Sequence, residues 1–129
     1  RRISLLKANR RHIDELVDFL HTKVSDSFTR NEKFLTEFSD SILIISGGFK
    51  EFIVPIVTSM GLKEENVYAN TFVFDDEDNI IGVDESNVLA HEKGKVKILQ
   101  QLNLDGDVYA IGDGYTDFEL RSSGLATQF

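Results

Sequence analysis

The chain has 129 residues, a formal net charge of −8 and no cysteine. This length suffices for one domain with its own core, and the negative charge argues against nucleic acid or an anionic membrane as partner, because both attract basic surfaces. The lack of cysteine excludes thiolate metal sites and fits a reducing cytoplasm, while the apolar run Ile42 to Ile45 is too short to span a bilayer. We therefore expect a soluble, cytoplasmic protein of undefined oligomeric state.

The two ends of the chain suggest an excerpt of a longer polypeptide. The sequence opens on Arg1 instead of methionine and stops at Phe129, within a segment (residues 125–129) that is typical of a strand. We expect further residues on both sides.

Two helices are predicted before Ser41. Apolar side chains recur at helical spacing over residues 10–24, with charged side chains opposite, and Asn9 is a plausible N-cap. The polar residues 25–30 separate this helix from a short second one that carries Phe34. Both helices need a partner surface for their apolar faces.

Strands and helices alternate from Ser41 onward. Residues 42–45 are typical of a strand buried in a parallel sheet, and glycines 47 and 48 are expected to end it. In the helix that follows, over residues 49–60, Pro55 lies either in the first turn or at a kink.

The same alternation continues to the end of the chain. It comprises a parallel strand (67–69), a hairpin (71–74 and 80–83) around an acidic turn, a helix (96–102) and a short buried strand (108–111). This order predicts an α/β fold with a doubly wound, Rossmann-like parallel sheet and a β-hairpin excursion.

A candidate cation site follows the last of these strands. In Gly112-Asp113-Gly114-Tyr115-Thr116-Asp117, the two aspartates would share one face if a helix begins near Tyr115. Paired carboxylates repel unless a cation lies between them, and Mg²⁺ prefers such oxygen ligands. The alternative is a solvated turn in which an aspartate caps the helix.

Two further motifs suit a phosphate group. Ser46-Gly47-Gly48 offers a hydroxyl and main-chain N–H groups at the start of a helix. Lys93-Gly94-Lys95 offers a lysine that could neutralise phosphate charge. In open α/β sheets the carboxyl ends of the strands share one ligand crevice, so the motifs are expected to converge. Ligand-free turns and solvated lysines are the ordinary alternative.

In this order the three motifs resemble the second, third and fourth motifs of the haloacid dehalogenase-like phosphatases, and the phosphoserine phosphatase branch is the closest match. The resemblance implies a phosphatase core over residues 40–129 and the remainder of a helical cap over residues 1–39. It also implies Mg²⁺-dependent hydrolysis of a small phosphorylated metabolite through an aspartyl-phosphate intermediate. The expected substrate is O-phosphoserine, as in serine biosynthesis.

The resemblance implies roles for individual residues as well. They are phosphate binding and catalysis by Ser46 and Lys93, phosphate binding by the Gly47 N–H, metal binding by Asp113 and Asp117, and substrate binding by Arg2 and Thr116. Lys93 is preferred to Lys95 because the family lysine immediately precedes the glycine of its motif.

The first motif of the family, Asp-x-Asp-x-Thr, is missing. Asp105-Gly106-Asp107 precedes a predicted strand instead of following one, and position 109 is tyrosine. Without its nucleophile the aspartyl-phosphate chemistry cannot run, so we expect this chain by itself to be inactive, and poorly soluble because a core without its first strand exposes a pairing edge. A related small-molecule phosphatase or phosphotransferase, or a non-catalytic phosphate-binding regulatory module, are the alternatives.

Overall fold

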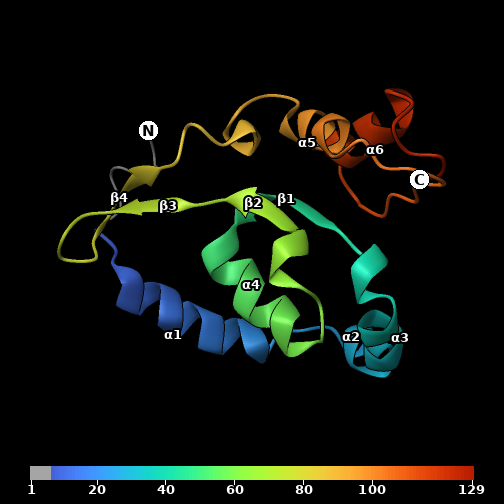
Figure 1. Ribbon diagram of the computed structural model, residues 1–129. Helices are drawn as coiled ribbons and strands as arrows, with labels where there is room; N and C mark the ends of the chain where they lie inside the picture. Colours follow the sequence, from blue (N-terminus) through green and yellow to red (C-terminus); the bar gives the residue numbers. More distant parts are fainter. Residues whose placement is uncertain (1–6) are drawn as a thin grey trace. The chain divides into compact units, whose positions relative to one another are not determined.

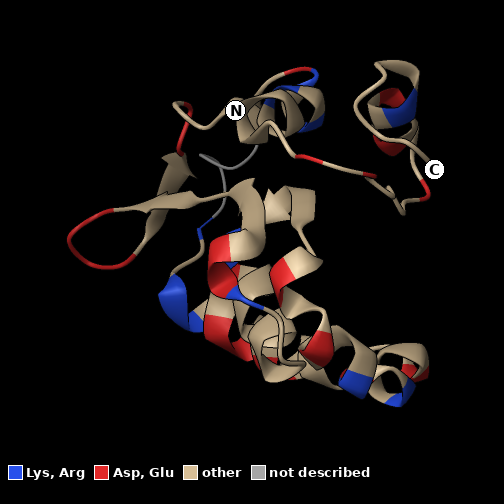
Figure 2. Ribbon diagram, turned by 45° about the vertical axis from the view of Figure 1, so that its right-hand side comes forward, with Lys and Arg blue, Asp and Glu red and all other residues tan. Residues whose placement is uncertain are grey.

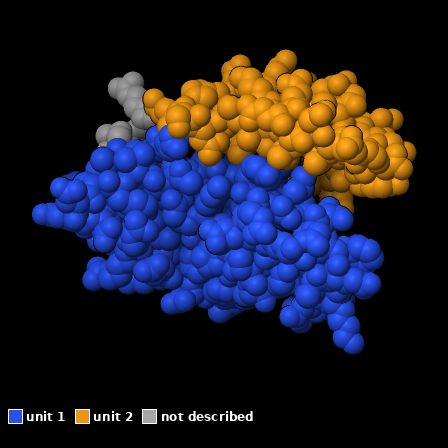
Figure 3. Space-filling model, in the orientation of Figure 1, with its two compact units in different colours: residues 1–84 blue, residues 85–129 orange. Residues whose placement is uncertain are grey.

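The computed structural model describes residues 7–129, and the chain divides into two compact units, residues 1–84 and residues 85–129 (Figure 3). Unit 1 contains α1 (Arg10–His21), α2 (Asp26–Arg30), α3 (Glu32–Glu37), η2 (Ser39–Ser41), β1 (Ile44–Phe49), α4 (Lys50–Ser59), η3 (Glu64–Asn66), β2 (Val67–Asn70), β3 (Phe72–Phe74) and β4 (Ile80–Val83). Unit 2 contains η4 (Val88–Ala90), α5 (Gly94–Leu102) and α6 (Tyr115–Ser122). In the described residues no helix is both long and apolar enough to cross a bilayer.

The predicted first helix is confirmed as α1, although it ends at His21 instead of Val24. Asn9 is the N-cap, as predicted. Its side-chain oxygen accepts hydrogen bonds from the N–H groups of Arg11 at 3.0 Å and His12 at 3.3 Å, and His12 Nδ1 accepts the Asn9 N–H at 3.0 Å. This reciprocal pair satisfies N–H groups that the helix itself leaves unbonded.

The polar residues 25–30 were predicted only to separate two helices, and most of this stretch itself forms α2. The helix has no buried residue, so it lacks the apolar stripe by which sequence periodicity identifies a helix. It ends at Asn31, whose side-chain amide donates to the Ser27 carbonyl at 2.7 Å. The predicted second helix is confirmed as α3.

A parallel βαβ unit, β1–α4–β2, is the centre of unit 1 (Figure 1). The strands pair at Ile44 with Val67 and, beyond an irregularity, at Phe49 with Asn70. Two details of the prediction are corrected here. β1 begins at Ile44 instead of Ile42, and it runs through the glycines that were expected to end it, because the parallel pairing resumes at Phe49.

Pro55 lies in the interior of α4, not in its first turn, because the helix begins directly at Lys50. A proline there cannot donate the main-chain hydrogen bond to the carbonyl one turn back. α4 is nevertheless well placed, since it contacts both β1 and β2. Their shared apolar cluster has at its centre Val57, Leu62, Val67 and Ala69.

The predicted hairpin is confirmed as the antiparallel pair β3–β4. Its apolar face packs against α1 in a second cluster, centred on Ile13, Val17, Phe72 and Ile80. The acidic turn between the strands is the red loop at the left of Figure 2. One helix predicted as part of the cap thus shares a core with the hairpin, while the division into cap and core at residues 39 and 40 stays a prediction.

In unit 2 the helix near Tyr115 is confirmed as α6, and α5 packs against it. The strands predicted at residues 108–111 and 125–129 are wrong. The described residues there form a single parallel bridge, between Tyr109 and Gln128, and Ile111 is 99% exposed. A strand in a sheet interior needs a hydrogen-bonded neighbour on each side, whereas the main-chain partners of residues 108–111 in the described part of the chain are Thr127 and Gln128, on one side.

Candidate functional site

The predicted site residues lie in both units. Ser46 and Gly47 are in β1 of unit 1, and the remaining described ones, Lys93, Asp113, Thr116 and Asp117, are in unit 2. Arg2 lies outside the described residues.

Ser46 has a fixed hydroxyl oxygen. Its Oγ accepts the N–H of Gly48 at 3.0 Å. A hydroxyl oxygen that accepts still has its own proton to donate, so Ser46 can offer an O–H to an anion. At Gly47 an added Cβ would meet no atom within 4 Å, so the main chain there is open to a close approach.

Asn70 supports this segment directly, Glu51 lies in the helix that follows it, and neither was predicted to have a role. Asn70, which is 5% exposed, donates from its side-chain amide to the Gly47 carbonyl at 3.0 Å. Glu51, in the first turn of α4, accepts the N–H of Phe72 at 2.9 Å. The sequence did contain a signal for each of them. Asn70 is a polar residue at the end of an apolar strand, and Glu51 is an acid at the start of a helix, where the helix dipole favours negative charge.

Lys93 is presented at the start of α5. It is the N-cap and has left-handed backbone angles, φ 56° and ψ 25°. The next residue must be small, because a Cβ on Gly94 would lie 2.6 Å from the Val88 carbonyl oxygen and 2.7 Å from the Leu89 Cα. Close packing against η4 therefore fixes the start of the helix. The Lys93 side chain is exposed, and it makes no ion pair with a carboxylate among the described residues.

The Asp117 carboxylate is held on both of its oxygens. Oδ1 accepts from Lys95 Nζ at 2.5 Å, and Oδ2 accepts the N–H of Gly114 at 3.2 Å. The hydrogen bond from Lys95, aided by that from Gly114, keeps the pKa of Asp117 below its usual value, although burial acts in the opposite direction. The side chain also lies against Gly112, where a Cβ would be 2.4 Å from the carboxylate.

Asp113 is exposed, and its carboxylate makes no hydrogen bond or ion pair with the described residues. Over residues 7–129, no three histidine, aspartate or glutamate side chains gather closely enough to share a metal ion. Mg²⁺ usually takes only one or two protein carboxylates and completes its shell with water and phosphate oxygens. Asp113 therefore fits a magnesium site as a single ligand, whereas Asp117 is already engaged by Lys95.

Lys95, like Asn70 and Glu51, was not predicted to have a role. Its position gave a signal, because Lys95 and the buried Leu99 are four residues apart and so share one face of α5. A lysine on the buried face of a helix needs a partner of opposite charge. Thr116, by contrast, is exposed in the first turn of α6, where it is accessible to a ligand.

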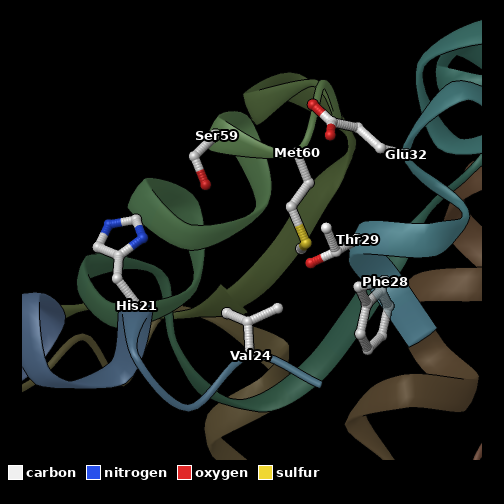
Figure 4. A pocket seen from close by; sticks show the side chains of 7 residues that line it. All are labelled: His21, Val24, Phe28, Thr29, Glu32, Ser59 and Met60. Carbon is white, nitrogen blue, oxygen red and sulfur yellow. The ribbon is translucent and has the colours of Figure 1, made fainter. Parts of the chain in front are cut away.

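Unit 1 also contains a pocket of about 210 Å³, shown in Figure 4. It is lined by His21, Val24, Phe28, Thr29, Glu32, Ser59 and Met60. None of the predicted site residues belongs to it, and its polar side chains are exposed to solvent. We assign it no ligand.

The comparisons with known proteins agree on one family. The chain is 33% identical over 132 residues to the chloroplastic phosphoserine phosphatase of Arabidopsis thaliana. This match covers 99% of the chain and 44% of the plant protein. It is 26% identical to the phosphoserine phosphatase of Homo sapiens, covering 92% of the chain and 54% of the human protein. No family model matches. The chain thus spans about half the length of the curated relatives it matches.

The fold has a counterpart among solved structures. The crystal structure of a phosphoserine phosphohydrolase-like protein from Francisella tularensis superposes with a TM-score of 0.75 at 26% identity, over 93% of this chain and 56% of that protein. The resemblance to the phosphoserine phosphatase branch and the α/β fold class are therefore confirmed.

Proposed function

We propose that this chain is part of a haloacid dehalogenase-like hydrolase that removes phosphate from a small phosphomonoester, with O-phosphoserine as substrate. The observation that carries the proposal is the similarity to a phosphoserine phosphatase over 99% of the chain. It is supported by the open main chain at Gly47 beside the fixed hydroxyl of Ser46. A role in serine biosynthesis, in the cytoplasm, follows from the same proposal.

The residues of this chain would bind and neutralise the phosphoryl group. Ser46 would donate its hydroxyl proton, and Gly47 its N–H, to phosphoryl oxygens. The Lys93 ammonium would balance their charge during transfer. The nucleophile would be an aspartate outside this chain. Its oxygen would bond to phosphorus as the bond from phosphorus to the ester oxygen breaks, and that oxygen would leave as a hydroxyl after taking a proton from an acid outside this chain. Water would then attack phosphorus, break its bond to the aspartate and release inorganic phosphate.

The loop of residues 112–117, called the acidic loop below, would hold Mg²⁺ through Asp113, in keeping with the exposed carboxylate of that residue. When bound, the ion would supply positive charge beside the phosphoryl oxygens. Asp117 would support the site indirectly, by its hydrogen bonds within the loop.

Substrate selection would involve Thr116 and Arg2. Thr116 would face the substrate from the start of α6, and Arg2 would pair with the substrate carboxylate. Residues 1–39 would belong to a helical cap and residues 40–129 to the catalytic core. Closure of the cap would exclude water from the site.

The proposal is tested by phosphate release from O-phosphoserine by the protein that includes the residues preceding Arg1, with and without Mg²⁺. Lys93→Met and Asp113→Asn should each lower kcat/KM by about two orders of magnitude or more. Lys97→Met is a matched control, because Lys97 is an exposed lysine of the same helix. Equal activity of the Lys93→Met and Lys97→Met proteins would refute the assignment of Lys93. The 129-residue chain should release no phosphate.

A second candidate function is that of a non-catalytic phosphate-binding regulatory module. The chain contains no Asp-x-Asp-x-Thr sequence, and Asp105-Gly106-Asp107 is followed by Val108 and Tyr109. The residues encoded before Arg1 decide between the two functions. An Asp-x-Asp-x-Thr after an apolar strand supports the hydrolase, and its absence supports the binding module.

A further inference from the structure

The ion pair between Lys95 and Asp117 joins α5 to α6 and differs from the other ion pairs among the described residues. Its side chains are 19% and 16% exposed, whereas those of the other pairs are 41–80% exposed. Solvated ion pairs contribute little to stability. A largely buried pair is different, because loss of one partner leaves the other charge in a poorly solvated place.

Asp117 contacts both glycines that flank Asp113. Its carboxylate accepts the N–H of Gly114 and lies 2.4 Å from the place where a Gly112 side chain would begin, and its main-chain N–H donates to the Gly114 carbonyl at 3.1 Å. The glycines on both sides of Asp113 are therefore fixed by one side chain. That side chain is in turn fixed by Lys95.

We propose that Lys95 is a positioning residue: by holding Asp117 against Gly112 and Gly114, it presets the turn from which Asp113 is presented as the ligand carboxylate. This inference deepens the proposed function and rests on it for the role of Asp113. The Lys95 ammonium is occupied by Asp117 at 2.5 Å, which leaves the exposed Lys93 to neutralise the phosphate. The two lysines of one short motif thus have different tasks.

The test uses three variants in the protein that includes the residues preceding Arg1. Lys95→Met keeps the aliphatic stem and removes the charge, and Lys97→Met removes an exposed charge from the same helix. Lys95→Met combined with Asp117→Asn removes both charges, while the asparagine oxygen can still accept the Gly114 N–H. The readouts are hydrogen exchange of the Gly114 amide without metal, and the Mg²⁺ concentration that gives half-maximal phosphate release.

We expect Gly114 exchange to accelerate about tenfold or more in Lys95→Met, because the uncompensated carboxylate turns toward water. The half-maximal Mg²⁺ concentration should rise in parallel, with a smaller change in KM for substrate. Lys97→Met should match the wild type in both readouts. The double variant should recover most of the Gly114 protection, which a lysine that acts only by packing would not produce.

The results separate this inference from the proposed function. Unchanged Gly114 exchange in Lys95→Met, or no recovery in the double variant, would overturn the positioning role even in an active enzyme. Lack of phosphatase activity in the wild type would refute the proposed function, and the exchange data would still report on the ion pair. Exchange of the buried Leu120 amide shows whether Lys95→Met folds. If that variant does not fold, a folded double variant supports the charge argument, and an unfolded double variant overturns it.

Discussion

The side-chain amide of Asn70 donates a hydrogen bond to the main-chain carbonyl of Gly47 at 3.0 Å. Asn70 lies at the end of β2, and Gly47 lies in the irregular part of β1, where the parallel pairing is interrupted between Ile45 and Phe49. The side chain therefore supplies a link between the strands where the regular ladder is interrupted. This link holds the segment on which Ser46 is placed.

Asn70→Ala should lower the free energy of unfolding by about 1–3 kcal/mol, because a buried polar contact is lost. Urea unfolding measures this change. Asn31→Ala is a matched control, since Asn31 makes the same kind of bond, to the Ser27 carbonyl, from an exposed position. Its effect should stay within about 0.5 kcal/mol. Equal effects of the two substitutions would show that burial of Asn70 does not matter.

Phe72 is the aromatic centre of the hairpin core. Its ring stacks on that of Phe49, with centroids 3.9 Å apart, and meets Phe52 edge to face at 5.7 Å. Phe72→Ala should cost about 3–5 kcal/mol in urea unfolding, because the substitution leaves a cavity. Val73→Ala, at the 39% exposed neighbouring position, should cost at most about 1 kcal/mol. A Phe72→Ala cost as small as that of Val73→Ala would contradict this account of the core.

Gly112→Ala should disrupt the acidic loop, because the new Cβ would lie 2.4 Å from the Asp117 carboxylate. We expect a loss of about 1–3 kcal/mol from this overpacking, measured by hydrogen exchange of the Leu120 amide in α6. Gly82→Ala is the control, since a Cβ there meets no atom within 4 Å. The free energy of unfolding of the Gly82→Ala protein should differ from that of the wild type by at most about 0.5 kcal/mol. Undiminished protection of Leu120 in Gly112→Ala would argue against close contact between Gly112 and Asp117.

The hairpin turn should depend on pH through Asp75. Its carboxylate accepts the main-chain and side-chain N–H groups of Asn79 and the N–H of Glu77, and these bonds hold the pKa of Asp75 below its usual value. A lowered pKa stabilises the folded turn above the unfolded value of about 3.9. That contribution is lost as the pH falls through the folded pKa.

The amide chemical shifts of Glu77 and Asn79 should therefore move together in a titration below about pH 4. In Asp75→Asn this joint step should vanish, because the asparagine does not titrate. Persistence of the step in that variant would assign it to another carboxylate.

The local pattern of the sequence was enough to predict the elements that are stabilised by their own residues or by their nearest neighbours in the chain. The Asn9 cap, the parallel pair around α4 and the hairpin were all predicted, because capping and apolar periodicity act over a few residues. α2 was missed because it has no buried side chain. The strand at residues 108–111 was predicted from its apolar composition alone, but a strand also needs neighbours to pair with.

The order of the three motifs likewise indicated the resemblance to the phosphoserine phosphatases, which the known relatives confirm. The sequence by itself thus named the residue types of the candidate site, including Asp113 and both lysines of the motif around Gly94. Only the tertiary structure decided which lysine contacts Asp117. The residues are 22 apart in the chain, and the packing of α5 on α6 directs Lys95 to the carboxylate while Lys93 stays exposed. Because such a contact depends on how two helices pack, local spacing could not have supplied it.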